Sequence, residues 1–89
     1  IMELTELDKV VIVTIYVRGN RSKKAHFPVD FICKGFPSHQ RGEVKRRVRK
    51  LRKRGYLSIK PHPSGMSYGL TDEGWRIAQE LEKDIRKMK

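Results

Sequence analysis

The sequence predicts a mostly helical α+β domain, and three observations lead to this fold class. A basic segment with an apolar stripe at helical spacing lies near the middle of the 89-residue chain. An alternating segment with turn residues at its centre follows and predicts a β-hairpin. A capped amphipathic segment then predicts a last helix. A chain of this length can bury one small core, so we expect a single domain over residues 1–89.

Residues 4–17 fit either a strand or a helix, because positions 10–13 are β-branched. Apolar residues nevertheless recur at helical spacing, and Thr5 with its acidic neighbours can cap a first turn. We favour a helix. Its expected buried positions are Leu4, Leu7, Val11, Thr14 and Ile15.

A short second helix is predicted over residues 28–34, with Pro28 in its first turn and Gly35 after its end. The third helix carries the basic segment and begins at Ser38 or Gly42. An apolar stripe on this helix predicts the face that it buries. The positions on that face are Val44, Val48, Leu51 and Gly55.

Residues 56–70 alternate around a His-Pro-Ser-Gly turn, which predicts a β-hairpin. Thr71 is placed to cap a final helix over residues 71–89, whose first turn is acidic. One face of that helix is apolar. Its members are Trp75, Ala78, Leu81, Ile85 and Met88.

Two patterns carry a resemblance to a known fold: Val48-x-x-Leu51-x-x-x-Gly55-Tyr56-Leu57 and, after the hairpin, Tyr68-x-Leu70-Thr71-x-x-Gly74. With three helices before a hairpin and one after it, the chain resembles the winged helix-turn-helix repressors, of which MarR-like and PadR-like regulators are members. The resemblance covers about a third of the chain. It implies one winged helix-turn-helix domain over residues 1–89, in which helix 71–89 is available for dimerisation.

Charge is concentrated in the third helix. Residues 41–54 hold nine Lys or Arg and one acid, which is +8 of the formal net charge of +11. Solvated helix faces usually mix charges of both signs, and like charges at helical spacing repel one another. A polyanion that rests against this helix would explain the pattern, and nucleic acid is the polyanion we favour.

The helix-turn-helix geometry assigns roles along this helix, because its N-terminal part meets base edges and its flanks meet phosphates. We expect base or groove contacts from Ser38, His39, Gln40, Arg41, Lys45, Arg46 and Arg49. We expect backbone contacts from Lys50, Lys53 and Arg54. The loop cluster of Arg21, Lys23 and Lys24 fits flanking backbone contacts and simple solvation equally well.

The hairpin is less basic than is common for a wing. Lys60 is the one fixed positive charge near its tip, where His62 and Ser64 could also hydrogen-bond to phosphate. A plain turn explains the tip equally well. The third helix should therefore carry most of the contact with nucleic acid.

The C-terminal helix allows two interpretations of its apolar face, which could complete the core of this chain or pack against a second copy. A helix of about eighteen residues is about 27 Å long, which exceeds what a small core requires. We favour a homodimer, which would match a two-fold operator. The candidate interface residues are Trp75, Leu81, Ile85 and Met88.

The sequence carries no pattern typical of an enzyme: no P-loop, no GxSxG motif and no paired carboxylates with an obvious cleft. We expect no cofactor and no metal, because the three histidines lack metal-site spacing and Cys33 is the only cysteine. Cys33 fits a core position better than a redox sensor. Neither a membrane span nor a signal peptide is evident, so a cytoplasmic location is expected.

These observations lead to one leading hypothesis and two alternatives. The leading hypothesis is a homodimeric transcriptional regulator that binds double-stranded DNA by inserting helix 41–54 into the major groove. One alternative is an RNA-binding or ribosome-associated winged-helix protein, although few aromatic residues are free for stacking on bases. The other is an interaction module that binds an acidic protein partner.

Overall fold

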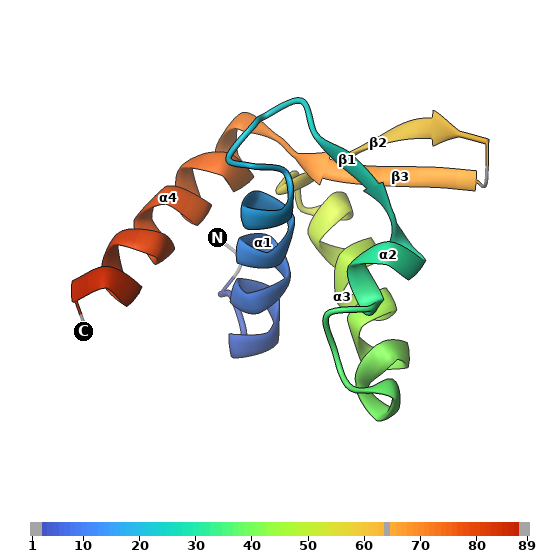
Figure 1. Ribbon diagram of the computed structural model, residues 1–89, viewed down its shortest axis with the longest axis horizontal. Helices are drawn as coiled ribbons and strands as arrows, with labels where there is room; N and C mark the ends of the chain where they lie inside the picture. The colour runs from blue at the N-terminus through green and yellow to red at the C-terminus, as the bar shows by residue number, and fades with distance from the viewer. Residues whose placement is uncertain (1–2, 64, 88–89) are drawn as a thin grey trace.

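The computed structural model describes residues 3–63 and 65–87, which form helices around a small sheet (Figure 1). The elements are α1 (Glu6–Arg18), β1 (His26–Pro28), α2 (Val29–Cys33), the 3₁₀ turn η1 (Ser38–Gln40), α3 (Arg41–Lys53), β2 (Leu57–His62), β3 (Gly65–Leu70) and α4 (Asp72–Lys87). The predicted order of helix, short helix, basic helix, hairpin and helix is confirmed. No helix in the described ranges is long and apolar enough to cross a membrane.

The N-terminal segment is a helix, as favoured over the strand interpretation. Thr5 is its N-cap: the Thr5 hydroxyl accepts a hydrogen bond from the Asp8 backbone N–H at 3.1 Å. The Asp8 carboxylate in turn accepts one from the Thr5 N–H at 2.9 Å. This reciprocal capping box satisfies backbone donors at the start of the helix and fixes where α1 begins.

The buried face predicted for α1 is only partly correct. Val11 and Ile15 are buried, but Leu4 and Leu7 are only partly so, and Thr14 is partly exposed. The reason is that α1 lies between α3 on one side and α4 on the other, so it buries a broader arc than one stripe (Figure 1). The buried residues of α1 are Asp8, Val11, Ile12, Ile15 and Tyr16.

The structure adds a strand that the sequence analysis did not predict. β1 pairs antiparallel with β3, so the sheet order is β1-β3-β2. Three residues are too few to show an alternating pattern. Gly69 permits the pairing, because a Cβ there would overlap the Ala25 carbonyl oxygen and the His26 ring. Pro28 ends β1 and precedes α2, instead of lying in the first turn of that helix.

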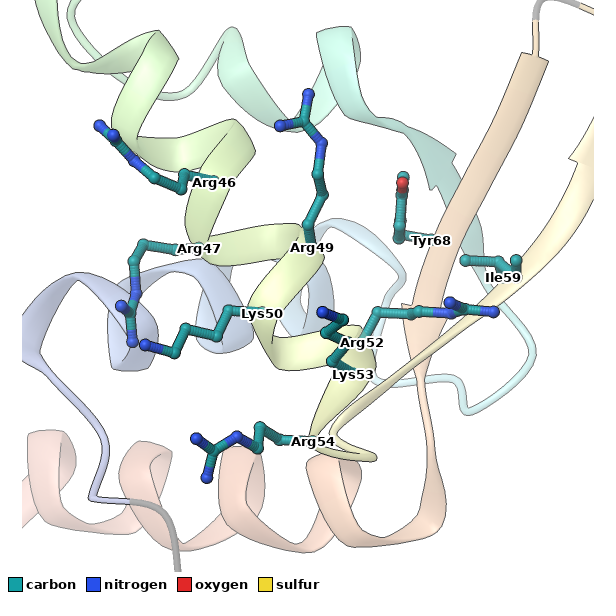
Figure 2. A pocket seen from close by; sticks show the side chains of 9 residues that line it. All are labelled: Arg46, Arg47, Arg49, Lys50, Arg52, Lys53, Arg54, Ile59 and Tyr68. Carbon is teal, nitrogen blue, oxygen red and sulfur yellow. The ribbon is translucent and has the colours of Figure 1, made fainter.

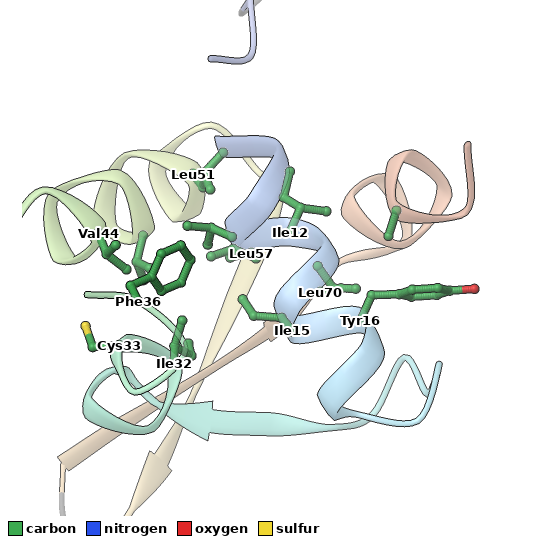
Figure 3. Packing of buried hydrophobic residues seen from close by; sticks show 13 residues of the cluster. Ile12, Ile15, Tyr16, Ile32, Cys33, Phe36, Val44, Leu51, Leu57 and Leu70 are labelled. Carbon is green, nitrogen blue, oxygen red and sulfur yellow. The ribbon is translucent and has the colours of Figure 1, made fainter. Parts of the chain in front are cut away.

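A single apolar cluster joins the helices to the hairpin (Figure 3). Val44, Val48 and Leu51 of α3 are fully buried in it, as predicted. The prediction for Gly55 is wrong, since this residue is exposed and follows the end of α3 with φ of 85°. A left-handed residue at this position ends a helix, and glycine adopts it without a steric penalty.

The two ends of the hairpin are tied together where α4 begins. The Thr71 hydroxyl accepts the Gly74 N–H at 3.1 Å, which confirms the predicted cap, and donates to the Gly55 carbonyl at 2.6 Å. Thr71 N–H also donates to the Tyr56 carbonyl at 3.2 Å. Gly74 lies against that same carbonyl, with no room for a Cβ. The Thr71-x-x-Gly74 pattern therefore allows the start of α4 to pack closely against Gly55 and Tyr56, which follow α3.

The contact at Gly74 leads to a stability prediction. Gly74→Ala should lower the free energy of unfolding by about 1–3 kcal/mol, because its methyl group overlaps backbone and the structure must shift. Gly42→Ala is the matched control, since Gly42 lies in α3 with open space around its Cα. It should leave stability unchanged or raise it by up to about 1 kcal/mol. Urea unfolding followed by Trp75 fluorescence measures both, and equal effects would contradict this account.

Candidate nucleic-acid interface

α3 presents its basic residues because its apolar stripe fixes its rotation. Val44, Val48 and Leu51 face the core, which turns Arg46, Arg49, Lys50 and Lys53 outward. Its last turn is basic, which suits the negative end of the helix dipole. The core contacts of α3 thus determine which of its surfaces carries the positive charge.

Three of the basic residues of α3 have acidic partners. Lys45 Nζ lies 3.5 Å from Asp30 of α2, and Arg46 lies 2.6 Å from Glu43 one turn earlier. Arg47 reaches Asp8 of α1 at 2.6 Å. Asp30 and Glu43 thus both belong to ion pairs.

The remaining basic residues of α3 and its C-terminal end have no acidic partner among the residues that the structure describes. Most of them lie in the C-terminal half of the helix, where Figure 2 shows them spread around its exposed side. An anionic ligand would meet unneutralised charge there. These residues are Arg41, Arg49, Lys50, Arg52, Lys53 and Arg54.

The ion pair of Arg47 with Asp8 differs from the others because it is buried. Asp8 is fully buried, and the Arg47 side chain is 15% exposed. The guanidinium donates through Nε and Nη2 to the two carboxylate oxygens, both at 2.6 Å. Burial raises the pKa of Asp8, but the hydrogen bonds from Arg47 and Thr5 outweigh it, and the pKa is lowered overall. The same hydrogen bonds, which Arg47 donates to Asp8, raise the pKa of Arg47.

This pair is the buried contact that sequence reasoning missed. In the sequence, Asp8 is one of the acidic residues near the Thr5 cap that suit the positive end of the helix dipole, and Arg47 has no assigned role. The spacing held a signal, because Asp8 falls on the same helical face as Val11, Ile12 and Ile15. An acid on an apolar face requires a buried partner.

An open groove of about 660 Å³ lies between α3 and the hairpin (Figure 2). The described residues that line it are seven Lys or Arg of α3 and its end, together with Ile59 and Tyr68 of the hairpin. The predicted backbone contacts Lys50, Lys53 and Arg54 all lie here, as do Arg46 and Arg49. The structure therefore brings together, in one groove, the predicted nucleic-acid contacts that lie in the C-terminal half of α3 and at its end.

The N-terminal half of the set lies at the start of α3. The structure places Ser38, His39 and Gln40 in η1, directly before the helix, and all three are exposed. Arg41 is the exposed first residue of α3. They form the leading end of the helix, and the groove lies toward its trailing end.

The loop cluster lies against α4. Arg21 pairs with Glu82 through Nη2 at 2.5 Å, which raises the pKa of Arg21. Lys23 Nζ lies 3.5 Å from Asp72 and 4.6 Å from the centre of the Trp75 ring. Lys24 is exposed in the same loop, which the Figure 1 ribbon places near the start of α4.

On the hairpin, Lys60 and His62 are exposed on β2, and Ser64 lies outside the described residues. The His26 Nε2 lies 3.0 Å from the Ser58 hydroxyl. Among the described residues, no cluster of His, Cys, Asp or Glu could hold a metal. Cys33 is buried, and burial raises the pKa of its thiol.

The candidates for a dimer interface divide between the core and the surface. Trp75 packs edge-on against Tyr16, with ring centres 6.2 Å apart, and its Nε1 donates to the Arg21 carbonyl at 3.0 Å. Leu81 and Ile85 line a groove of about 460 Å³ between α4 and α1, and Ile85 is 50% exposed. Met88 lies outside the described residues.

Comparison with solved structures identifies the fold. AF1382 from Archaeoglobus fulgidus superposes with a TM-score of 0.77 at 20% identity, over 97% of this chain and 91% of that one. The multiple antibiotic resistance repressor MarR gives 0.74 at 16% identity, over 97% of this chain and 59% of MarR. This chain has the winged-helix fold of the MarR-like regulators.

A mutant MarR from E. coli, in complex with operator DNA, also matches, with a TM-score of 0.69 at 17% identity over 91% of this chain. The present chain covers 55% of that protein, so it spans little more than half the length of these MarR chains. No protein-family model matches the chain, and no curated protein matches it. The fold assignment thus rests on structural superposition and not on sequence similarity.

The buried ion pair leads to a prediction about stability and pH. Asp8→Asn should lower the free energy of unfolding by about 3–5 kcal/mol at pH 7, because it leaves Arg47 without its buried charge partner. The folded-state pKa of Asp8 lies below the ordinary value of 3.8. The contribution of the ionised carboxylate is therefore present above about pH 4 and is lost as the pH falls through the folded-state pKa.

The difference in stability between wild type and Asp8→Asn should accordingly narrow below about pH 4, as measured by urea unfolding between pH 7 and pH 3. Lys50→Gln serves as the control, because Lys50 is exposed and has no acidic partner among the described residues. It should change stability by less than about 0.5 kcal/mol. A pH-independent difference would show that Asp8 charge is not what stabilises the contact.

Proposed function

We propose that the protein is a transcriptional regulator that binds double-stranded DNA and places α3 in the major groove. The observation that carries the proposal is the set of unneutralised Lys and Arg residues on the outward face of a helix whose rotation the core fixes. The winged-helix fold supports it, since the MarR structure that superposes on this chain was solved with operator DNA.

The proposed contacts divide by position along α3. The leading end would read bases, because the N-terminal residues of a recognition helix meet base edges. The trailing end would hold phosphates. The proposed base or groove contacts are Ser38, His39, Gln40, Arg41, Lys45, Arg46 and Arg49. The proposed backbone contacts are Lys50, Lys53 and Arg54, with Arg21, Lys23 and Lys24 as flanking candidates and Lys60, His62 and Ser64 on the hairpin.

Selection of binding sites from random duplexes at about 150 mM salt tests this function directly, because enrichment requires both affinity and sequence preference. Structured RNA as a competitor distinguishes the RNA-binding alternative. Copurification with an acidic protein, without affinity for nucleic acid at that salt, would support the interaction-module alternative and overturn the proposal.

The charge distribution leads to a prediction about salt. Five unpartnered cations line the groove, so the slope of log affinity against log salt should be about −4 or steeper for each protomer. Raising salt from 50 to 200 mM should weaken duplex binding by about 10²–10³-fold, as measured by fluorescence anisotropy. An affinity that hardly changes over this range would contradict electrostatic binding by α3.

Two alanine variants check the division along the helix. Lys53→Ala should weaken selected and random duplexes alike and reduce the magnitude of the slope by about 0.9. Arg46→Ala should mainly reduce the preference for the selected site, by about 1–3 kcal/mol. If both variants affected selected and random duplexes equally, the assignment of base and backbone contacts would be wrong.

We also propose a homodimer, in which the apolar groove between α1 and α4 packs against a second copy. Leu81 and Ile85 of α4 line this groove together with Val10 and Val13 of α1. Val10 is 49% exposed and Ile85 50% exposed, and contiguous exposed apolar side chains of this kind mark interaction sites. Two copies related by a two-fold axis would present two α3 helices to successive major grooves.

Ile85→Glu should therefore shift the protein toward monomer by introducing a charge into the apolar interface. Sedimentation equilibrium measures the dissociation constant, which should rise by at least about tenfold. Lys83→Glu is the control, because Lys83 is an exposed residue of the same helix outside this groove. A wild-type protein that is monomeric at high concentration would overturn the dimer.

A further inference from the structure

The groove between α3 and the hairpin has two chemically different walls (Figure 2). One wall belongs to the trailing half of α3, where Arg49, Arg52 and Lys53 project. None of these three has an acidic partner among the described residues, so their charge is available to a ligand. Arg52 was assigned no role from the sequence, yet in Figure 2 it extends toward the hairpin beside Ile59.

The opposite wall is apolar and is set by the strand register. Ile59 of β2 pairs with Tyr68 of β3, and both line the groove. Alternate residues of a strand lie on one face of the sheet. The same face therefore carries two further cross-strand pairs, one at each side of Ile59 and Tyr68. These are the buried pair Leu57 and Leu70 and the exposed pair Pro61 and Met66.

This face of the hairpin thus forms an apolar ladder that begins in the core and continues to the exposed end of the strands. Met66 is 51% exposed, although it is a large apolar side chain. Such exposure next to a dense cluster of cations does not suit a ligand that is only ionic. It suits one that alternates charged and apolar groups.

Tyr68 supplies a hydrogen-bonding group on the hairpin wall of the groove. Its side chain is half-buried, and its hydroxyl projects into the groove (Figure 2). That hydroxyl has no hydrogen-bond partner among the described residues. A phenol can donate one hydrogen bond to an anionic oxygen, and such charge-assisted bonds are stronger than neutral ones.

We propose that this groove holds the sugar–phosphate backbone of one DNA strand. The phosphates would lie against Arg52 and Lys53, with the Tyr68 hydroxyl donating to a phosphate oxygen. The deoxyribose rings would pack on the apolar ladder of the hairpin. The inference rests on the proposed DNA-binding function and adds contacts from Arg52 and Tyr68, together with the face of the hairpin.

The groove also accounts for the composition of the hairpin tip. Residues 61–66 contain no Lys or Arg, so the tip offers little fixed charge to the minor groove. With the backbone held at the base of the hairpin, the contact does not depend on charge at the tip. Because backbone contacts carry no sequence information, the contacts from Arg52 and Tyr68 should contribute equally to selected and random duplexes.

Two substitutions that preserve size test this inference in the full-length chain. Tyr68→Phe removes only the hydroxyl and should weaken duplex binding by about tenfold, with an unchanged salt slope. Arg52→Gln should weaken binding and reduce the magnitude of the slope by about 0.9. Both losses should be the same on selected and random duplexes.

The matched controls lie elsewhere on the molecule. Tyr16→Phe removes a hydroxyl from a tyrosine that packs on Trp75 of α4, and Arg76→Gln removes an exposed charge from α4. Both should bind duplex DNA as the wild type does. Thermal unfolding of all four variants confirms that each is folded before binding is compared.

The outcomes separate this inference from the function on which it rests. If the wild type binds duplex DNA and both Tyr68→Phe and Arg52→Gln bind equally well, the groove proposal is overturned and DNA binding stands. If the wild type does not bind duplex DNA, the proposed function itself fails. If either variant changes sequence preference, the groove contacts bases, and the backbone assignment is overturned.

Discussion

The buried ion pair between Asp8 and Arg47 determines how α3 sits on the rest of the fold. Apolar contacts are not directional, so the stripe sets which face of α3 is buried but not its exact position along α1. The planar Arg47 guanidinium meets both carboxylate oxygens of Asp8 at 2.6 Å, and this geometry admits one position. Asp8 also accepts the Thr5 N–H, which supplies the further hydrogen bond that a buried carboxylate requires. The start of α1 and the middle of α3 are thereby fixed together.

The remaining charges of α3 are distributed unevenly along the helix. Lys45 and Arg46 are balanced by Asp30 and Glu43 near the leading end, whereas the trailing end is unbalanced. Positive charge is least costly near the C-terminal end of a helix, where the dipole is negative. Under the proposed function, the partnered leading end would suit discrimination between bases, and the unbalanced trailing end would suit affinity for any duplex.

Much of this arrangement follows from local patterns in the sequence. Helical spacing correctly predicts that Val44, Val48 and Leu51 are buried, and turn chemistry correctly places the hairpin and the Thr71 cap. Long-range contacts could not be predicted in this way, because Asp8 and Arg47 are 39 residues apart. The strand β1 was not predicted because three residues are too few to show an alternating pattern. Its pairing with β3 depends on the absence of a side chain at Gly69, which the pattern of β1 itself does not reveal. The structure locates the proposed contact residues other than Ser64, and their binding roles are predictions.

The same fixed geometry explains why α3 and the hairpin can act together on one ligand. Gly55 turns the chain from α3 into β2, and Thr71 bonds back to the Gly55 carbonyl at 2.6 Å from the other end of the hairpin. Leu57 and Leu70 anchor the hairpin face in the core that also holds α3. The separation between the cationic and apolar walls is therefore set by the core before any ligand arrives. A preformed groove needs little ordering on binding, so more of its contact energy contributes to affinity.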